Sequence, residues 1–406
     1  MIDLPETPTV SREWRARLLS LIEKTKRDPP SNLAAVVRDE LGLDLSTRYG
    51  GIPIPHPFGK ASGQLSHKLS QVQNDIESGL AFIVLKTVIA EDAESGRTMQ
   101  AWTIPETRMQ VERKLSVSGK AGWTISWKGR GWPGSLDEYL SFFGVALPLA
   151  KAAGVPVVPS VKYHLPDCGQ PFRNDEYSHT TKKLVEVWDR VGCEGQMVLE
   201  KDFSPTLAGD RLSQSKESVL RWLSEVPRLI EQAAPKRVRL GVKLMNALFD
   251  DEFQIEMLRT LAERAKPSPA FLVVFNRLFD SASGVAYGGW DLSERNQRVL
   301  HRARLALLRL PPLSATGNIC SGRVMIEYAL CGCENGQLHT FFQVPLSEYT
   351  ATGGSRSARA LHTLILHPTQ GLSVWLRHLG EAGILERRDD LLWFCDLVET
   401  AGSQVR

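Results

Sequence analysis

Residues 314–342 read SATGNICSGRVMIEYALCGCENGQLHTFF. The pattern predicts a short strand ending at Gly317, a loop with Ser321 and Gly322, a helix, and a second strand ending at His339. Glycines let backbone N–H groups approach a phosphate, and the N-terminus of a helix adds partial positive charge. The segment therefore predicts a strand–helix–strand unit with a phosphate site at one end.

Similar apolar runs alternate with amphipathic helical patterns along most of the chain. The predicted strands are residues 57–63, 81–89, 154–163, 195–202, 237–244, 270–276, 310–317 and 334–342. Their nearly continuous apolar character is typical of parallel strands buried on both faces. Eight such units predict an α/β fold, a (β/α)8 TIM barrel. A doubly wound open sheet is the alternative, but no run leads into the G-x-G-x-x-G turn of a dinucleotide fold.

Three regions are expected: an N-terminal helical extension (1–43), the barrel (44–349) and a C-terminal helical tail (350–406). Residues 12–25 predict an amphipathic helix whose stripe includes Trp14 and Leu19, and Pro29–Pro30 stops it. A basic amphipathic helix can lie on a membrane surface. Because the apolar face is short, we expect this helix to pack on the domain instead.

The composition is that of a globular chain, with 406 residues, 42% hydrophobic, 23% charged and a net charge of +3. This weak charge argues against a nucleic-acid partner, and the charge-rich residues 293–309 are expected to form a solvated helix face. No apolar run approaches the roughly 20 residues of an integral membrane segment. The six cysteines lack zinc-site or disulfide-framework spacing, so no metal is expected. The N-terminus has no secretory signal pattern, which predicts a cytoplasmic protein.

Functional residues of a parallel barrel lie at the C-terminal ends of its strands. Lys86 and Lys243 both stand near the ends of apolar runs, where a buried ammonium without a partner is costly. Each lysine either faces a ligand or forms an ion pair with an acidic residue at the barrel mouth. His164 follows the third run and is a candidate acid or base, because histidine titrates near neutral pH.

Eight motifs also follow one another in a characteristic order. They are DLSTRYGGIPIPHPFGKASG (44–63), IVLKTVI (83–89), WKGRGWPGSLDEYL (127–140), FSPT (203–206), RLGVKL (239–244), VVFN (273–276), YGGWD (287–291) and ATGNICSGRVMIEYALCGCENGQLHTFF (315–342). Together they resemble the FMN-dependent dihydroorotate dehydrogenase barrels and their dihydropyrimidine dehydrogenase relatives. The resemblance implies an FMN-binding TIM barrel.

The resemblance also implies roles for individual residues. The implied cofactor-binding residues are Ala61, Ser62, Gly63, Lys86, Lys243, Gly317, Asn318, Ser321, Gly322, His339 and Thr340. Lys243 would lie at the N1–O2 edge of the flavin, where its charge stabilises the reduced anion. Ser204 stands where the family has its catalytic base, and His164 is the alternative. The implied catalytic set is therefore Ser204, Lys243 and His164.

The substrate site departs from the family. Asn276 is kept, but the other implied substrate-binding positions are Ser126, Trp127, Trp132 and Thr206. Each amide that is lost would leave a polar edge of orotate without its hydrogen bond, at a cost of about 1–3 kcal/mol. We therefore expect a substrate other than orotate, with an apolar or aromatic face.

These observations predict an FMN-dependent oxidoreductase of specialised metabolism that acts on a C–C bond next to a carbonyl or amide of a small cyclic substrate. The alternative is a barrel without redox catalysis that serves as a non-redox lyase, an isomerase or a binding protein. The expected partners are the small-molecule substrate and, as a hypothesis, a second copy of the chain in a homodimer.

Overall fold

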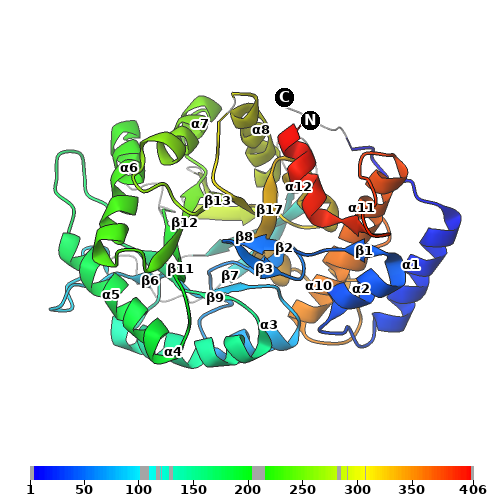
Figure 1. Cartoon of the computed structure of the whole chain (residues 1–406), viewed down its shortest axis with the longest axis horizontal. Helices are drawn as coiled ribbons and strands as arrows, with labels where there is room; N and C mark the ends of the chain where they lie inside the picture. Colours follow the sequence, from blue (N-terminus) through cyan, green and yellow to red (C-terminus); the bar gives the residue numbers. More distant parts are fainter. Residues whose placement is uncertain are drawn as a thin grey trace.

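The computed structural model describes residues 4–100, 109–115, 119, 121–127, 131–203, 215–280, 285–289, 291–306 and 308–403. Its centre is a curled sheet of ten parallel strands (Figure 1). They are β4 (Phe58–Lys60), β5 (Ile83–Val84), β6 (Val88–Ile89), β9 (Val157–Val158), β10 (Ser160–Lys162), β11 (Met197–Asp202), β12 (Val238–Met245), β13 (Phe271–Asn276), β16 (Leu313–Thr316) and β17 (Cys333–Leu338).

The strand order shows that this sheet closes on itself. It runs β6-β10-β11-β12-β13-β16-β17-β4-β5-β9. Because β5 and β6 belong to one run of chain, and β9 and β10 to another, the ten strands form eight parallel segments. These two runs pair at both ends of the order, through Val161 with Val88 and through Ile83 with Val157. The TIM-barrel-like fold and its eight predicted strands are thus confirmed.

Helices surround the sheet in the expected alternation. They are α3 (Leu69–Glu77), α4 (Leu136–Ala153), α5 (Asn174–Arg190), α6 (Lys216–Ala233), α7 (Asp251–Arg259), α8 (Leu292–Leu305) and α9 (Gly322–Leu330). Local sequence explains where several begin: Ser135 accepts a hydrogen bond from the backbone of Glu138 at α4, and Asp250 does the same for Phe253 at α7. A π-helical turn (Thr260–Arg264) continues α7.

The barrel interior is filled at its N-terminal end. The hairpin of β2 (Thr47–Tyr49) and β3 (Ile52–Ile54) inserts Tyr49, which stacks on Phe82 with ring centroids 3.9 Å apart. Tyr49 also meets Phe271 edge to face. This apolar layer closes the bottom of the barrel, so a ligand must enter at the opposite end.

A second sheet lies at that opposite end. It is antiparallel, with the order β14-β15-β8-β7, and consists of β7 (Met109–Leu115), β8 (Ala121–Trp127), β14 (Leu278–Asp280) and β15 (Val285–Gly289). Two loops supply its strands, one after β6 and one after β13. The sequence patterns did not predict these strands, since short polar hairpins carry little periodic signal.

The two ends of the chain pack on each other (Figure 1). The elements are α1 (Arg12–Thr25), α2 (Leu33–Leu41), β1 (Leu43–Asp44), α10 (Arg356–Leu366), α11 (Leu372–Glu381), β18 (Leu392–Trp393) and α12 (Phe394–Ser403). β1 pairs with β18 in parallel, and Thr25 Oγ1 lies 2.9 Å from Nε2 of His362. The helix at 12–25 was predicted correctly, but Leu19 is 46% exposed and Leu21 is buried in its place.

In the part of the chain that the structure describes, no helix has both the length and the apolar character needed to span a membrane. The charge-rich residues 293–309 include α8, whose arginines make ion pairs described below.

Candidate functional site

A cavity of about 60 Å³ lies at the C-terminal end of the barrel. Its walls come from the ends of β4, β12, β13, β16 and β17, and the antiparallel sheet covers it with Trp123 and Gly288. Residues predicted from sequence that meet here are Ala61, Ser62, Lys243, Asn276, Gly317, Asn318, His339 and Thr340. Residues far apart in the chain are thus brought together where barrel chemistry is expected.

Lys243 reaches the cavity from β12 and is tied to a buried carboxylate. Its Nζ lies 3.4 Å from Oε1 of Glu200 on β11 and donates to Oε1 of Gln337 at 2.9 Å. Gln337 donates in turn to Oε2 of Glu200 at 2.5 Å. Lys243 therefore agrees with both hypotheses drawn from the sequence, because it forms an ion pair with an acidic residue and also lines the cavity.

His339 lies against Gly63 on the other side of the cavity. A Cβ atom on Gly63 would come within 2.5 Å of Cδ2 of the imidazole, so only glycine leaves room for this ring. Burial, together with the nearby charges of Lys60, Lys86, Arg277 and Lys243, lowers the pKa of His339 to about 3. The imidazole is neutral near pH 7, and the surroundings favour an anion over a cation.

A row of hydroxyl groups extends from Ser62, which lines the cavity, into the barrel wall. Ser62 Oγ lies 2.9 Å from Oγ1 of Thr87, which lies 3.0 Å from Oγ of Ser160. Lys86, one residue before Thr87, is 3% exposed and contributes to the charge around His339. Lys60 points to the outer side of β4, where it forms a buried ion pair with Asp75 at 3.1 Å.

The loop after β16 turns beside the cavity. Gly317 and Asn318 line the cavity, with φ values of 94° and 54°. Asn318 tolerates the left-handed conformation and donates from Nδ2 to Ser293 Oγ at 3.0 Å. Across the cavity, Thr340 Oγ1 donates to the carbonyl of Gly288 at 3.2 Å.

Ser321 and Gly322 have other partners. Ser321 Oγ accepts from the backbone of Val324 and caps α9, while the carbonyl of Gln370 accepts from the backbone of Arg323. A Cβ atom on Gly322 would lie 1.9 Å from the backbone nitrogen of Leu372. The N-terminus of α9 thus meets the C-terminal helices. Neither residue lines the cavity described above, but Ser321 lines the open groove that adjoins it.

No family model matches the chain. No curated protein matches its sequence. The crystal structure of DHODH from Eimeria tenella in complex with ferulenol is similar over 94% of this chain and 94% of that one, with a TM-score of 0.57. The chain is similar to DHODH in fold. The sequences are only 14% identical, so the shared property is the barrel.

Other predicted residues lie apart from the cavity of this DHODH-like barrel. Trp132 packs against Tyr139 and Phe142, with ring centroids 5.4 Å from each. His164 follows β10, accepts a hydrogen bond from the backbone of Arg173 through Nδ1, and has its pKa lowered to about 4 by burial and by Arg173. Such a ring is neutral near pH 7.

Four predictions fall on residues whose side chains the structure does not describe. Ser204 and Thr206 lie outside the described residues altogether. Ser126 and Trp127 belong to β8 through their backbone, and their side chains lie outside the description. The predicted catalytic base and most of the predicted substrate contacts therefore stay predictions.

The sequence reasoning missed several residues that the fold brings to the site. Glu200 and Asp202 project from the same face of β11, and Asp202 pairs with Lys162 of β10 at 3.9 Å. The acidic residues at alternating positions of the buried run MVLEKD (197–202) were the available signal. Trp123, which lines the cavity, gave no such signal because its strand was not predicted.

An open groove of about 720 Å³ adjoins the cavity. The two share Trp123, Asn318, Cys320 and Phe341, and the groove continues between α8, α9 and the segment around Gln370. The small cavity is therefore one end of a larger space.

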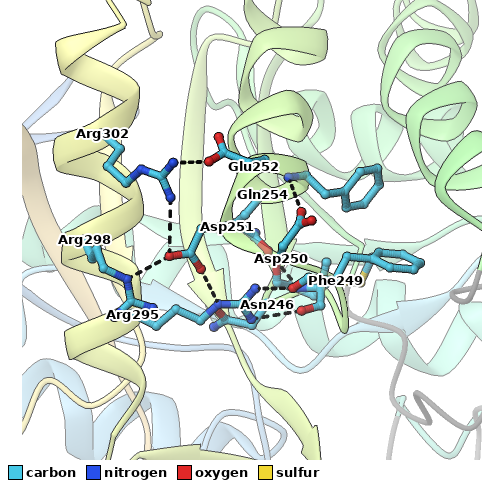
Figure 2. Close-up of polar contacts among 12 residues, drawn as sticks. Asn246, Phe249, Asp250, Asp251, Glu252, Gln254, Arg295, Arg298 and Arg302 are labelled. Carbon is cyan, nitrogen blue, oxygen red and sulfur yellow. Dashed lines mark hydrogen bonds and ion pairs between the residues drawn. The ribbon is translucent and has the colours of Figure 1, made fainter.

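Figure 2 shows the contacts that fix the loop after β12. Asp251 of α7 binds Arg295, Arg298 and Arg302 of α8, with N–O distances of 3.2, 2.7 and 3.8 Å. Arg295 also donates to the carbonyl groups of Ala247 and Phe249. At the start of the loop, Asn246 Nδ2 donates to the carbonyl of Asn276 at 2.7 Å. The ion pairs thus hold the loop that adjoins the cavity-lining Asn276.

Proposed function

We propose that the chain is an FMN-dependent oxidoreductase. It would transfer hydride between flavin N5 and a C–C bond next to a carbonyl or amide of a small cyclic substrate other than orotate. The observation that carries the proposal is the single cavity in which eight predicted residues meet from five strand ends. The structural neighbour, DHODH, supports an oxidoreductase of this general kind.

The residues present suit a flavin mononucleotide in charge and chemistry. Gly317, Asn318 and Thr340 would hold the phosphate, because all three line the cavity and carry backbone or side-chain donors for an anion. Ala61 and Ser62 would contact the ring, and Lys243 would offer positive charge to its reduced form. A bound flavin supplies the hydride chemistry itself.

The volume of the cavity places one condition on flavin binding. Small-molecule sites typically hold about 300–1,000 Å³, whereas the cavity holds about 60 Å³. The imidazole of His339 occupies part of this end of the barrel, against Gly63. Flavin binding therefore requires His339 to turn away from Gly63, while the adjoining groove provides the remaining room.

The substrate would lie beside Asn276 and under Trp123, which both line the cavity. An indole favours an apolar or aromatic face of the substrate. Asn276 offers an amide to one polar group. Together, the indole of Trp123 and the amide of Asn276 suit a cyclic substrate with a single carbonyl or amide edge better than they suit orotate.

The test is flavin binding by the purified full chain. We expect flavin absorbance on purification, or after incubation with FMN, and a spectrum that bleaches when the correct substrate is added under anaerobic conditions. FMN should bind more tightly than riboflavin, which lacks the phosphate. A colourless protein that binds neither compound would contradict the proposal and favour the non-redox barrel.

A further inference from the structure

Glu200 stands directly behind the lysine of the cavity. It is completely buried on β11 and does not line the cavity, whereas Lys243 and Gln337 do. Its Oε1 lies 3.4 Å from Nζ of Lys243. A carboxylate at this distance opposes the ammonium charge, because the low polarity of the interior screens their interaction only weakly.

The carboxylate is held in one orientation. Gln337 donates to Glu200 Oε2 at 2.5 Å and accepts from Lys243 at 2.9 Å, so one amide joins both charged groups. Gln337 Nε2 also lies 3.5 Å from the hydroxyl oxygen of Tyr49. Burial and the charge of Glu200 raise the pKa of Tyr49 well above its usual value, so this phenol stays neutral. The side chains of Glu200, Gln337 and Lys243 therefore have little freedom to rearrange.

Other charged groups near Lys243 come from the ends of several strands of the barrel. Asp202 lies opposite Lys243 in the β11–β12 register and pairs with Lys162. Lys60, Lys86 and Arg277 act together with Lys243 on His339. Glu200 is the acidic group in direct contact with Lys243 among these described residues, and it is therefore the nearest opposing charge.

We infer that Glu200 is a positioning residue that fixes Lys243 at the cavity wall and limits how much of its positive charge reaches a bound anion. This inference rests on the proposed function, and it adds that the flavin potential is set by a lysine–glutamate pair and not by the lysine alone. Without Glu200 the ammonium would act on the reduced flavin at full strength.

The first test compares Glu200→Gln with the parent protein. The amide keeps the size and one acceptor of the glutamate while removing its charge. We expect the reduced form of bound FMN to be favoured about tenfold, which is ~30 mV upward for a two-electron couple. Lys243→Gln should shift the potential downward. Glu176→Gln changes another buried glutamate, one that binds Thr98, and should leave the potential unchanged.

The double variant Glu200→Gln/Lys243→Gln guards against misfolding, because it leaves no buried charge without a partner. If Glu200 acts through the lysine, this variant should have the potential of Lys243→Gln. An equal potential in Glu200→Gln and parent, or an undiminished shift from Glu200→Gln in the Lys243→Gln background, would overturn the inference.

A flavin-free measurement separates this inference from the proposed function. Inorganic sulfate should bind the apoprotein several-fold more tightly in Glu200→Gln and more weakly in Lys243→Gln, as measured by calorimetry. If the parent binds no flavin but sulfate follows this order, the proposed function fails and the role of Glu200 stands. If sulfate affinity is the same in all three proteins, the role of Glu200 fails.

Discussion

The imidazole of His339 packs so closely on Gly63 that a methyl group at that glycine would come within 2.5 Å of the ring. Under the proposed function, the same contact has to open before a flavin ring can lie beside Ala61 and Ser62. The two positions should therefore be coupled in flavin binding.

Gly63→Ala should weaken FMN binding at least tenfold, because the added methyl group pushes the imidazole further into the cavity. His339→Gly in the same chain should restore the affinity by emptying that space. Titration of apoprotein with FMN, followed by flavin fluorescence, measures both effects. Gly144→Ala is the matched control, since its Cβ would lie 3.5 Å from Val187 in ordinary contact. Independent, additive effects of the two changes would argue against this coupling.

Asn318→Asp should separate phosphate binding from ring binding. A carboxylate in the loop after β16 repels the FMN phosphate at close range, so FMN affinity should fall by about tenfold or more. Riboflavin carries no phosphate, and its affinity should change little. Parallel titrations with the two flavins check this. An equal loss for both would show that Asn318 supports the fold of the loop rather than the phosphate.

Gly322→Ala should destabilise the protein through the packing of α9 on the C-terminal helices. The new Cβ would collide with the backbone of Leu372 and with the carbonyl of Leu364, at 1.9 and 2.4 Å, so α9 and α11 must separate. We expect a loss of about 3 kcal/mol in the free energy of unfolding, as for an overpacked core. Ser321→Ala removes only the N-cap of α9 and should cost about 1 kcal/mol. Urea denaturation measures the free energy of unfolding of both variants. Equal losses in the two would mean that the contact between α9 and α11 is loose.

Asp251→Asn should loosen the loop shown in Figure 2. Burial alone would raise the pKa of Asp251, but hydrogen bonds from Arg298 and Arg295 outweigh it and lower the pKa. Its charge therefore stabilises the fold above the pKa of an unfolded aspartate and is lost at acid pH. We expect a loss of about 1–2 kcal/mol at pH 7. Glu252→Gln, which alters the exposed partner of Arg302, should cost less than half as much.

Buried histidines should make the fold less stable below about pH 6.5. Burial lowers the pKa of His56 and of His362 to about 4, from an ordinary value of 6.5. The unfolded chain therefore takes up protons first as the pH falls, and stability present above about pH 6.5 is lost toward pH 4. Each fully buried group should contribute a loss of about 2 kcal/mol between about pH 6.5 and pH 5.

His362→Gln tests whether this histidine contributes to the loss of stability at acid pH, since glutamine can still form hydrogen bonds with Thr25 and Thr350 but does not titrate. Unfolding free energies measured across this pH range should fall less steeply in the variant, by about 2 kcal/mol in total. An unchanged slope would mean that other groups cause the acid sensitivity.

The pattern of apolar runs along the chain was enough to predict the barrel. Its eight apolar runs became eight parallel segments in the predicted order, because burial on both faces requires continuous apolar stretches that are visible in one dimension. The helix over 12–25 was equally clear, although its buried stripe includes Leu21 and leaves Leu19 in solvent. Periodicity fixes the type of element, but the exact face depends on what packs against it.

Which residues meet at the site depends on how distant segments of the chain pack together. Glu200 and Lys243 lie on separate strands, and the sequence around each residue does not predict their ion pair. Nor does it predict that Gln337 of the last strand contacts both side chains. The pairing of Leu43 with Leu392 and the sheet over the barrel mouth depend in the same way on long-range contacts. Such contacts join segments far apart in the chain, so their partners are chosen by packing and electrostatics in three dimensions and not by local sequence pattern.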